Sequence, residues 1–262
     1  MVATIRVEVK MDAPEFSGIE ITHVDRVEIA MSPRYWEFAT VHRREIDRHF
    51  ACFQKTRPVW NGRVLLLERY FIRDGVLHGL CFETDYASLI AWIDWNFPDR
   101  TVYNFFGAAA MRAADGAYLI GEMGQHTAGA GQLSFPCGTP EPSDLDANGS
   151  FDLTRSLSRE LHEETGIDID ELDPEPGWIL VRDRCYLALM RQLVSRESAR
   201  GLQRRVKAHL ASEQCPEFSD ICMVRGSAEL DARMPPFVAA FLREQWRDDV
   251  PRICTTMTPP IA

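Results

Sequence analysis

The sequence has no long hydrophobic run, and this absence excludes one class of protein at once. No apolar stretch reaches the roughly 18 residues that a membrane-spanning helix needs. The first residues, MVATIRVEVKMD, alternate charged and apolar side chains and lack the apolar middle of a signal peptide. We therefore expect a cytoplasmic protein without a membrane partner.

Paired cysteine motifs and an excess of basic residues are also absent from the sequence. The seven cysteines are an odd number and form no CxxC pair, which favours reduced thiols over a disulfide framework or a structural zinc site. Lys and Arg total 29 against 39 Asp and Glu, a net charge of −10. This balance argues against a nucleic-acid partner. An anionic substrate is still allowed, because bound metal ions can reverse the local field.

What is present is an ordinary globular composition, with 45% hydrophobic residues over 262 positions. In the first part of the chain, alternation of apolar and polar residues predicts strands over 4–9 and 19–30, and helical spacing predicts helices over 34–54 and 85–97. Between these helices, residues 63–83 read as two strands joined at Asp74-Gly75, a hairpin signal. Pro98-Asp99-Arg100 then suggests a domain boundary.

The second part mixes strands and helices without a regular alternation. Strands are expected over 102–111, near 117–124 and 132–138, within 178–194, and over 218–226; helices are expected over 153–165, 197–214 and 235–246. Residues 139–152 are rich in Pro, Asp, Gly and Asn and read as a loop. The pattern predicts an α+β fold with a mixed sheet and helices packed on it.

The most informative segment is DLTRSLSRELHEETGI, residues 152–167. Asp152 is suited to begin a helix, and Gly166 is suited to end one in a left-handed conformation. At about 100° per residue, Glu160, Glu163 and Glu164 fall within an arc of roughly 100°. Leucines 153, 157 and 161 occupy the same side of the helix.

That placement separates two interpretations of a Glu-rich helix. A solvated acidic face is the common one, but here the acids lie beside the leucine stripe that must face the core. Converging carboxylates would repel one another and lose hydration. A bound divalent cation removes both penalties, and carboxylate oxygens suit Mg²⁺ or Mn²⁺. The geometry of the helix therefore favours a metal site.

The same helix resembles a known family motif. Residues 159–167, RELHEETGI, match every fixed position of REUxEExGU, the core of the Nudix box, where U is aliphatic. The resemblance implies a Nudix α/β/α sandwich with a mixed sheet, in which metal ions activate water against a phosphoric anhydride. It implies Glu160, Glu163 and Glu164 as metal ligands, with Glu163 and Glu164 catalytic, and Arg159 as the organiser of the carboxylates.

The upstream half of the motif departs from the family. The usual glutamate position, eight residues before Arg159, is Phe151. Gly138 is the best match to the glycine of the box, which implies about seven inserted residues. Three acids are candidates for the missing glutamate: Asp152, Asp144 and Glu141.

Flanking residues provide further candidates. The small residues of HTAGAG allow close backbone approach to a phosphate or ribose, or form a plain tight turn. His126 could orient a substrate phosphate, with Gly138 nearby, although a loop histidine is more often simply solvated. Among downstream acids that could act as general base or extra ligand, we choose Glu217, ahead of Glu213, Asp220 and Asp183, because it lies near a strand end.

The first hundred residues exceed what a Nudix domain needs. RPVWNGRVLLLERY followed by CFETDYASLIAW resembles the extension of UDP-glucose and UDP-galactose Nudix hydrolases. We expect residues 1–100 to be an α+β extension for substrate selectivity or dimerisation, and 101–262 to be the hydrolase domain. The sequence leaves open whether the protein forms a homodimer.

The expected function is cleavage of the diphosphate of a nucleoside diphosphate linked to another moiety. The best candidate substrate is a UDP-sugar such as UDP-glucose. The alternatives are ADP-ribose, NADH, coenzyme A derivatives, or a non-catalytic nucleotide-binding sensor. The intact glutamates count against the sensor.

Overall fold

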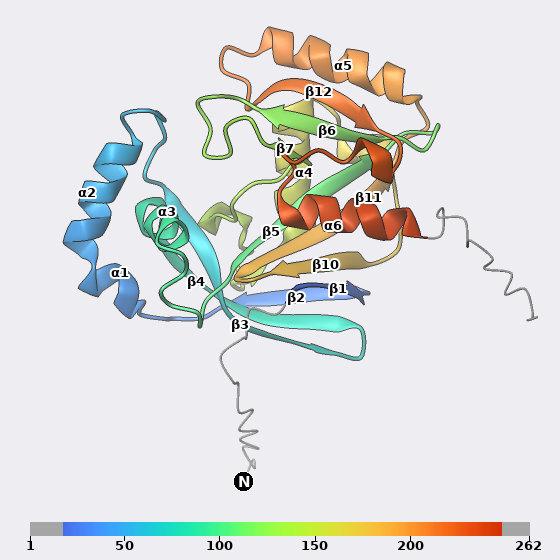
Figure 1. The fold of residues 1–262 in the computed structure, drawn as a ribbon. Coiled ribbons are helices and arrows are strands. Elements are labelled where there is room, and N and C mark those ends of the chain that lie inside the picture. The colour runs from blue at the N-terminus through green and yellow to red at the C-terminus, as the bar shows by residue number, and fades with distance from the viewer. Residues whose placement is uncertain (1–17, 248–262) are drawn as a thin grey trace, which may run out of the picture.

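The computed structural model describes residues 18–247, and its larger sheet is mixed, as expected (Figure 1). β5 and β11 run parallel, and the other neighbouring pairs run antiparallel. The short β7 (Leu133–Ser134) adds to β6, and β9 (Asp173–Pro174) adds to β11. The order across the sheet is β1 (Ile19–Val24), β10 (Trp178–Asp183), β11 (Tyr186–Val194), β5 (Asn104–Arg112), β6 (Tyr118–Met123) and β12 (Phe218–Val224).

Helices cover both faces of this sheet. Alternate residues of the central strand β5 point to opposite faces. Phe105 and Ala109 join a core with the apolar faces of α4 (Leu153–Thr165) and α5 (Ala199–Ser212). Phe106 and Ala108 pack into a separate core with α6 (Pro236–Gln245). The fold is therefore α+β, with the helix–sheet–helix layering that we expected. No helix within residues 18–247 is long and apolar enough to cross a membrane.

A second, smaller sheet belongs mainly to the first hundred residues. Its order is β3 (Arg63–Arg73), β4 (Val76–Asp85), β2 (Arg26–Met31) and β8 (Ser150–Phe151). Asp74 and Gly75 both have positive φ, 50° and 73°, so the predicted Asp-Gly hairpin turn is confirmed. Next to this sheet lie α1 (Glu37–Val41), α2 (Arg43–Phe53) and α3 (Tyr86–Asp94).

Two expectations for the N-terminal part need comment. The helix predicted over 34–54 is two helices, because the chain leaves helical geometry at His42, where φ is −99° and ψ is 18°. The residues predicted as one alternating segment, 19–30, are two strands that belong to different sheets. The strand predicted over 4–9 lies outside the described residues.

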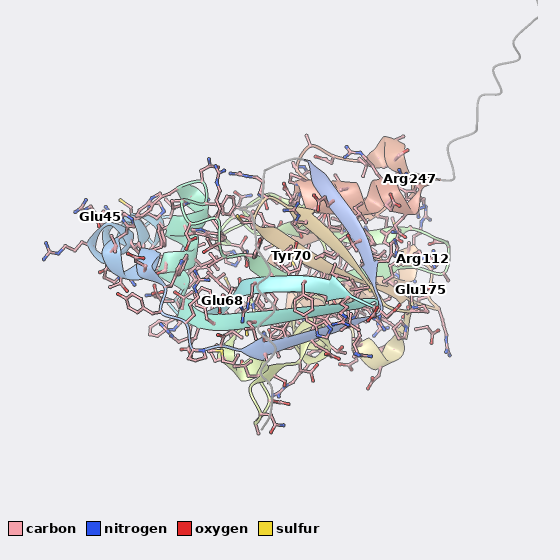
Figure 2. All side chains as sticks on the ribbon, turned by 90° about the horizontal axis from the view of Figure 1, so that it is seen from below. Glu45, Glu68, Tyr70, Arg112, Glu175 and Arg247 are labelled. Atoms are coloured by element: carbon pink, nitrogen blue, oxygen red, sulfur yellow. The ribbon has the colours of Figure 1, made fainter. Side chains whose placement is uncertain are left out.

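The N-terminal part and the rest of the chain are interlocked. β1 pairs with β10 along its whole length, and β8 pairs with β2. Buried residues of β3, including Leu65 and Leu67, belong to the same core as the leucines of α4. Glu45 on α2 and Arg247 beyond α6 lie at opposite ends of the molecule (Figure 2). The division near residue 100 stays a prediction, and the strand pairing ties the two parts together.

Candidate active site

Helix α4 has the limits that its sequence predicts. The carboxylate of Asp152 accepts a hydrogen bond from the backbone N–H of Arg155 at 2.9 Å, which satisfies one of the free donors of the first turn. Gly166 ends the helix with a φ of +67°, a conformation that favours glycine. Leu153, Leu157 and Leu161 are buried in the core below. These local interactions fix which side chains α4 presents to the protein interior.

The three glutamates of α4 do not share one environment. Glu160 and Glu164 are buried, with exposed fractions of 9% and 3%, whereas the side chain of Glu163 is 57% exposed. The expectation that all three point into the protein is therefore wrong for Glu163. The helical angles explain the difference, because Glu163 lies on the side of Glu160 away from the leucine stripe. His162, on the opposite side of α4, is exposed and pairs with Asp168 at 2.8 Å.

Glu164 is held by the strand that enters the inserted loop. Its Oε2 atom accepts a hydrogen bond from the backbone N–H of Cys137 at 3.0 Å. Its Oε1 atom is buried and has no hydrogen-bond partner within the described part of the chain. At Gly138, a Cβ atom would lie 2.0 Å from the carboxyl group of Glu160. A Cβ atom here would displace the carboxyl group of Glu160, which accounts for Gly138 at this position.

Arg159 lies among three carboxylates. Its guanidinium nitrogens are 2.8 Å from Glu160, 3.2 Å from Glu163 and 3.4 Å from Asp144. Asp144 is 2% exposed and also accepts a hydrogen bond from the hydroxyl of Ser156 at 3.0 Å. Arg159 thus connects the acids of α4 to the inserted loop.

The structure distinguishes the three acids considered for the missing box glutamate. Asp152 caps α4, and Glu141 caps the short 3₁₀ helix η1 (Pro142–Asp144). Asp144 is the one that contacts Arg159. Spacing along the chain could not single it out, because the inserted loop folds back so that the backbone N–H of Asp152 donates to the carbonyl of Asp144 at 3.0 Å.

The charge of a third carboxylate, on Glu217 immediately before β12, acts on both Glu160 and Glu164. Burial raises the pKa of Glu164 well above its ordinary value, and the negative charge of Glu217 raises it further. Burial also raises the pKa of Glu160 to about 7, against the attraction of Arg159. Of the other downstream candidates, Asp220 pairs with Lys207 at 2.8 Å and Glu213 is exposed just beyond α5.

His126 lies on a loop beside the backbone of Glu217. The N–H of Gly124 donates to the carbonyl of Glu217 at 2.6 Å, and the N–H of Thr127 donates to the carbonyl of Gly124 at 3.1 Å. A Cβ atom at Gly124 would be 2.8 Å from the ring of His126. From the N-terminal part, Arg57 donates through Nε to the carbonyl of Thr127 at 3.1 Å. The extension therefore contacts the loop that borders Glu217.

The arrangement fits a divalent cation in its chemistry. Glu160, Glu164 and Glu217 bring oxygen donors of the kind that Mg²⁺ and Mn²⁺ prefer, and Glu164 has an orphaned buried oxygen. Within residues 18–247, no three potential ligands are already gathered at metal-binding positions. Binding would therefore require carboxylates to turn, and Glu163, with its exposed and flexible side chain, has the freedom to do so.

Neither a protein-family model nor a curated protein sequence matches the chain. Solved structures align with it. The MutT protein of Methanosarcina mazei Go1 is 16% identical, with a TM-score of 0.38, over 56% of this chain and 96% of its own. The Nudix hydrolase RenU of M. smegmatis is 13% identical, with a TM-score of 0.37, over 62% of this chain and 92% of its own. Nudix hydrolases are thus among the solved structures to which this chain is similar.

Proposed function

We propose that the protein is a metal-dependent Nudix hydrolase that cleaves the phosphoric anhydride of a nucleoside diphosphate linked to another group. The observation that carries the proposal is the buried pair Glu160 and Glu164, on which the charge of the exposed Glu217 also acts, and in which one oxygen of Glu164 has no partner among the described residues. Such a cluster is costly unless a cation compensates it.

The chain's own groups have distinct roles in this proposal. A bound Mg²⁺ or Mn²⁺ would supply charge neutralisation for the diphosphate and a water of lowered pKa. Glu160, Glu163 and Glu164 would hold the metal, and the N–H of Cys137 fixes the orientation of Glu164. Arg159 keeps the carboxylates in place through its contacts with Glu160, Glu163 and Asp144.

Glu217 is suited to accept a proton from the attacking water. It lies on an exposed segment immediately before β12, and its backbone carbonyl is fixed by Gly124. Its exposure gives an accepted proton a route to solvent. His126, on the same side, would orient a phosphate of the substrate, and Gly138 would allow the substrate close to the backbone.

A UDP-sugar is our proposed substrate class, with ADP-ribose, NADH and coenzyme A derivatives as competitors. The support is the resemblance of the extension and its hydrogen bond from Arg57 to the loop that carries His126. Side chains of the extension that line the substrate pocket can discriminate between substrates through a few hydrogen bonds. Such contacts can change the ratio of kcat/KM values for two substrates by a factor of about 10² or more. A non-catalytic sensor is the alternative, and the retained glutamates oppose it.

A substrate panel on the full chain tests the proposal. UDP-glucose, UDP-galactose, ADP-ribose, NADH and a coenzyme A ester are compared by kcat/KM with Mg²⁺ and with Mn²⁺, and again with EDTA. We expect hydrolysis that EDTA abolishes and that favours a UDP-hexose. A tenfold preference for another member would reject the UDP-sugar assignment only. No metal-dependent hydrolysis of any member would reject the enzyme.

A further inference from the structure

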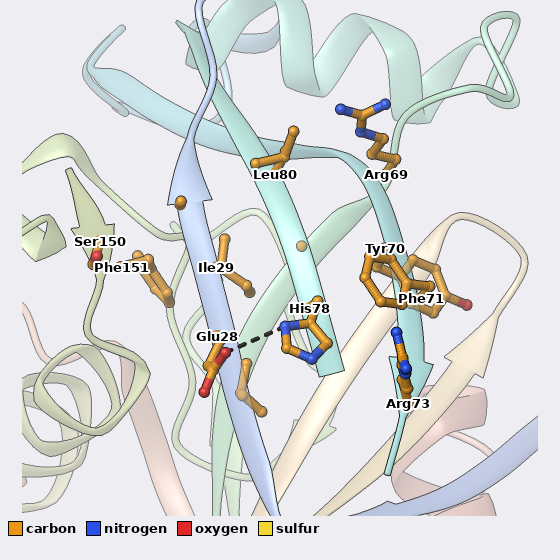
Figure 3. Close-up of a pocket in the computed structure, with 13 residues that line it drawn as sticks. Glu28, Ile29, Arg69, Tyr70, Phe71, Arg73, His78, Leu80, Ser150 and Phe151 are labelled. Atoms are coloured by element: carbon orange, nitrogen blue, oxygen red, sulfur yellow. Dashed lines mark ion pairs between the residues drawn. The ribbon is translucent and has the colours of Figure 1, made fainter. Parts of the chain in front are cut away.

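The outward face of the second sheet is hollowed by a cavity of about 1180 Å³ (Figure 3). Its walls come from β2, β3, β4 and β8, and none of the glutamates of α4 lines it. It is therefore separate from the candidate active site. Its volume slightly exceeds the usual range of cavities that take small organic molecules, about 300–1,000 Å³.

The floor of this cavity presents apolar and aromatic surface to solvent. Phe71 on β3 is opposite His78 on β4, which in turn is opposite Glu28 on β2. The rings of Phe71 and His78 are stacked, with centroids 5.0 Å apart, and Phe71 is still 57% exposed. Leu80 lies two residues further along β4 and extends the apolar surface (Figure 3). A flat or chain-like apolar group would find contact area here.

Two arginines flank Phe71 on the same face of β3. Arg69 and Arg73 line the cavity on the two sides of Phe71 (Figure 3). Within residues 18–247, no carboxylate lies within ion-pairing distance of Arg69. Arg73 is 3.5 Å from Asp74, but both side chains are largely exposed, 78% and 89%, so this pair is weak.

The acidic residue in the cavity does not neutralise these arginines. Glu28 is already bonded by Arg26 at 2.7 Å and by His78 at 3.2 Å. Among residues 18–247, the two guanidinium groups that line this apolar cavity therefore have only the weak Arg73–Asp74 pair, in a chain whose net charge is −10. Guanidinium groups form strong bidentate contacts with carboxylates, sulfonates and phosphates.

We propose that this cavity binds a small amphipathic organic anion, whose apolar body covers Phe71 and Leu80 and whose anionic group bonds Arg69 or Arg73. Neither the apolar surface nor the arginines alone would select this ligand. The apolar part gains by leaving water, and the anion gains from a cation that lies beside a surface of lowered polarity. This site is independent of the proposed hydrolase function.

The test uses 8-anilinonaphthalene-1-sulfonate, a fluorescent amphipathic anion, titrated into the native full-length protein without metal. We expect saturable binding of one molecule per chain. The Arg69→Gln, Arg73→Gln double variant should bind at least about tenfold more weakly, because charge-assisted hydrogen bonds are lost. Binding of the neutral N-phenyl-1-naphthylamine should change by less than about threefold in this double variant, because no charge-assisted bond is involved.

Arg63→Gln is the matched control. Arg63 begins the same strand, lies outside the cavity lining and pairs with Glu83 at 2.6 Å, so its loss should leave the affinity unchanged. Decanoate should displace the probe, whereas inorganic phosphate and decanol at the same concentration should not. Circular dichroism verifies that the variants, all at exposed positions, keep the native fold.

Equal affinities of wild type and the double variant would overturn the proposal, as would equal weakening by Arg63→Gln. Displacement by phosphate alone, as effective as that by decanoate, would show that the apolar surface contributes nothing and would also overturn it. Analytical sedimentation over the same protein concentrations measures whether the chain dimerises. Dimerisation that competes with the probe would assign this face to a second copy of the chain instead.

Discussion

At the scale of single residues, burial divides carboxylates that the sequence presents as equivalent. Glu160 and Glu164 lose water, and Glu163, one residue from Glu164, keeps it. The buried pair is held in place by Arg159 and by the N–H of Cys137. Without a cation, the burial and mutual repulsion of these carboxylates cost free energy. This cost has measurable consequences for turnover and for the pH dependence of stability.

The first consequence concerns turnover. We expect Glu164→Gln to lower kcat by at least about a hundredfold while the fold survives, because a metal-activated water carries the proposed reaction. His162→Ala is the control, since His162 is exposed and pairs with Asp168 on the far side of α4. Purified variants are compared with the best substrate at saturating Mg²⁺. Near wild-type turnover in the Glu164 variant would remove this residue from the mechanism.

The second consequence concerns stability without metal. The pKa of Glu160 is raised to about 7 in the fold, from an ordinary value near 4.5. A raised pKa means that the stabilising effect of the proton is complete below about pH 4.5 and is lost as the pH rises through 7. In EDTA, Glu160→Gln should therefore melt a few degrees above wild type at pH 8, with the gap closing towards pH 5.

Thermal melts across that pH range decide this point, with Glu163→Gln as the exposed control. A gap that is independent of pH, or one that grows towards pH 5, would contradict the assigned shift. Addition of Mn²⁺ at pH 8 should reverse the order of the two proteins, because the cation binds only where the carboxylates remain.

At the scale of elements, the helices of the N-terminal part are joined by one capping residue. Asp85 begins α3 by accepting hydrogen bonds from the N–H of Ser88 at 3.0 Å and from its hydroxyl at 2.9 Å. The same carboxylate pairs with Arg43 of α2 at 2.8 Å. One side chain thus satisfies a helix terminus and fixes the neighbouring helix against it.

We expect Asp85→Ala to lower the free energy of unfolding by about 2 kcal/mol at pH 7, from the lost cap and the lost partner of Arg43. Burial alone would raise the pKa of Asp85, but hydrogen bonds from Arg43 and Ser88 lower it on balance. A lowered pKa means that the ionic part of this effect is present at neutral pH and is lost as the pH falls through the folded-state pKa.

Urea unfolding at pH 7 and near pH 3 measures both parts. Asp47→Ala is the matched control, because Asp47 pairs with the same Arg43 at 2.9 Å from an exposed position, where such pairs contribute little. Equal losses in the two variants would show that capping by Asp85 contributes nothing.

Sequence patterns predicted the limits of helices and turns better than they predicted contacts between segments that are distant in the sequence. The limits of α4 follow from Asp152 and Gly166, and the hairpin follows from Asp74-Gly75, because these signals are local. The contact of Asp144 with Arg159 depends on how the inserted loop returns to α4, which no local signal specifies. The exposure of Glu163 could have been read from its angle to the leucine stripe, because the stripe marks the buried side.

At the scale of the whole molecule, the two sheets share strands from both parts of the chain. β1 lies in the sheet of the candidate hydrolase domain, and β8, from the inserted loop, lies in the sheet of the extension. The long-range partners of these strands were not predictable from alternation, which gives the face of a strand and not its neighbour. This exchange of β1 and β8 between the two sheets connects the extension to the candidate hydrolase domain.

This exchange predicts a single cooperative unfolding transition. Four of the six tryptophans, at positions 36, 60, 92 and 95, lie in the first hundred residues, so their fluorescence reports mainly on the extension. Far-ultraviolet circular dichroism reports on the whole chain. We expect both probes to give the same urea midpoint within about 0.2 M, as two-state unfolding requires. Two separated midpoints would show that the extension unfolds independently.

The pairing of β1 with β10 also sets an order of events during synthesis. Ile19 pairs with Asp183, so the first strand of the larger sheet leaves the ribosome long before its partner exists. At about 5–20 residues per second, the interval is roughly 8 to 30 seconds. Throughout it β1 is a nascent strand with free backbone donors and acceptors, open to pairing with another newly made chain. Slower translation of the segment between the two strands would lengthen that exposure and lower the yield of native protein.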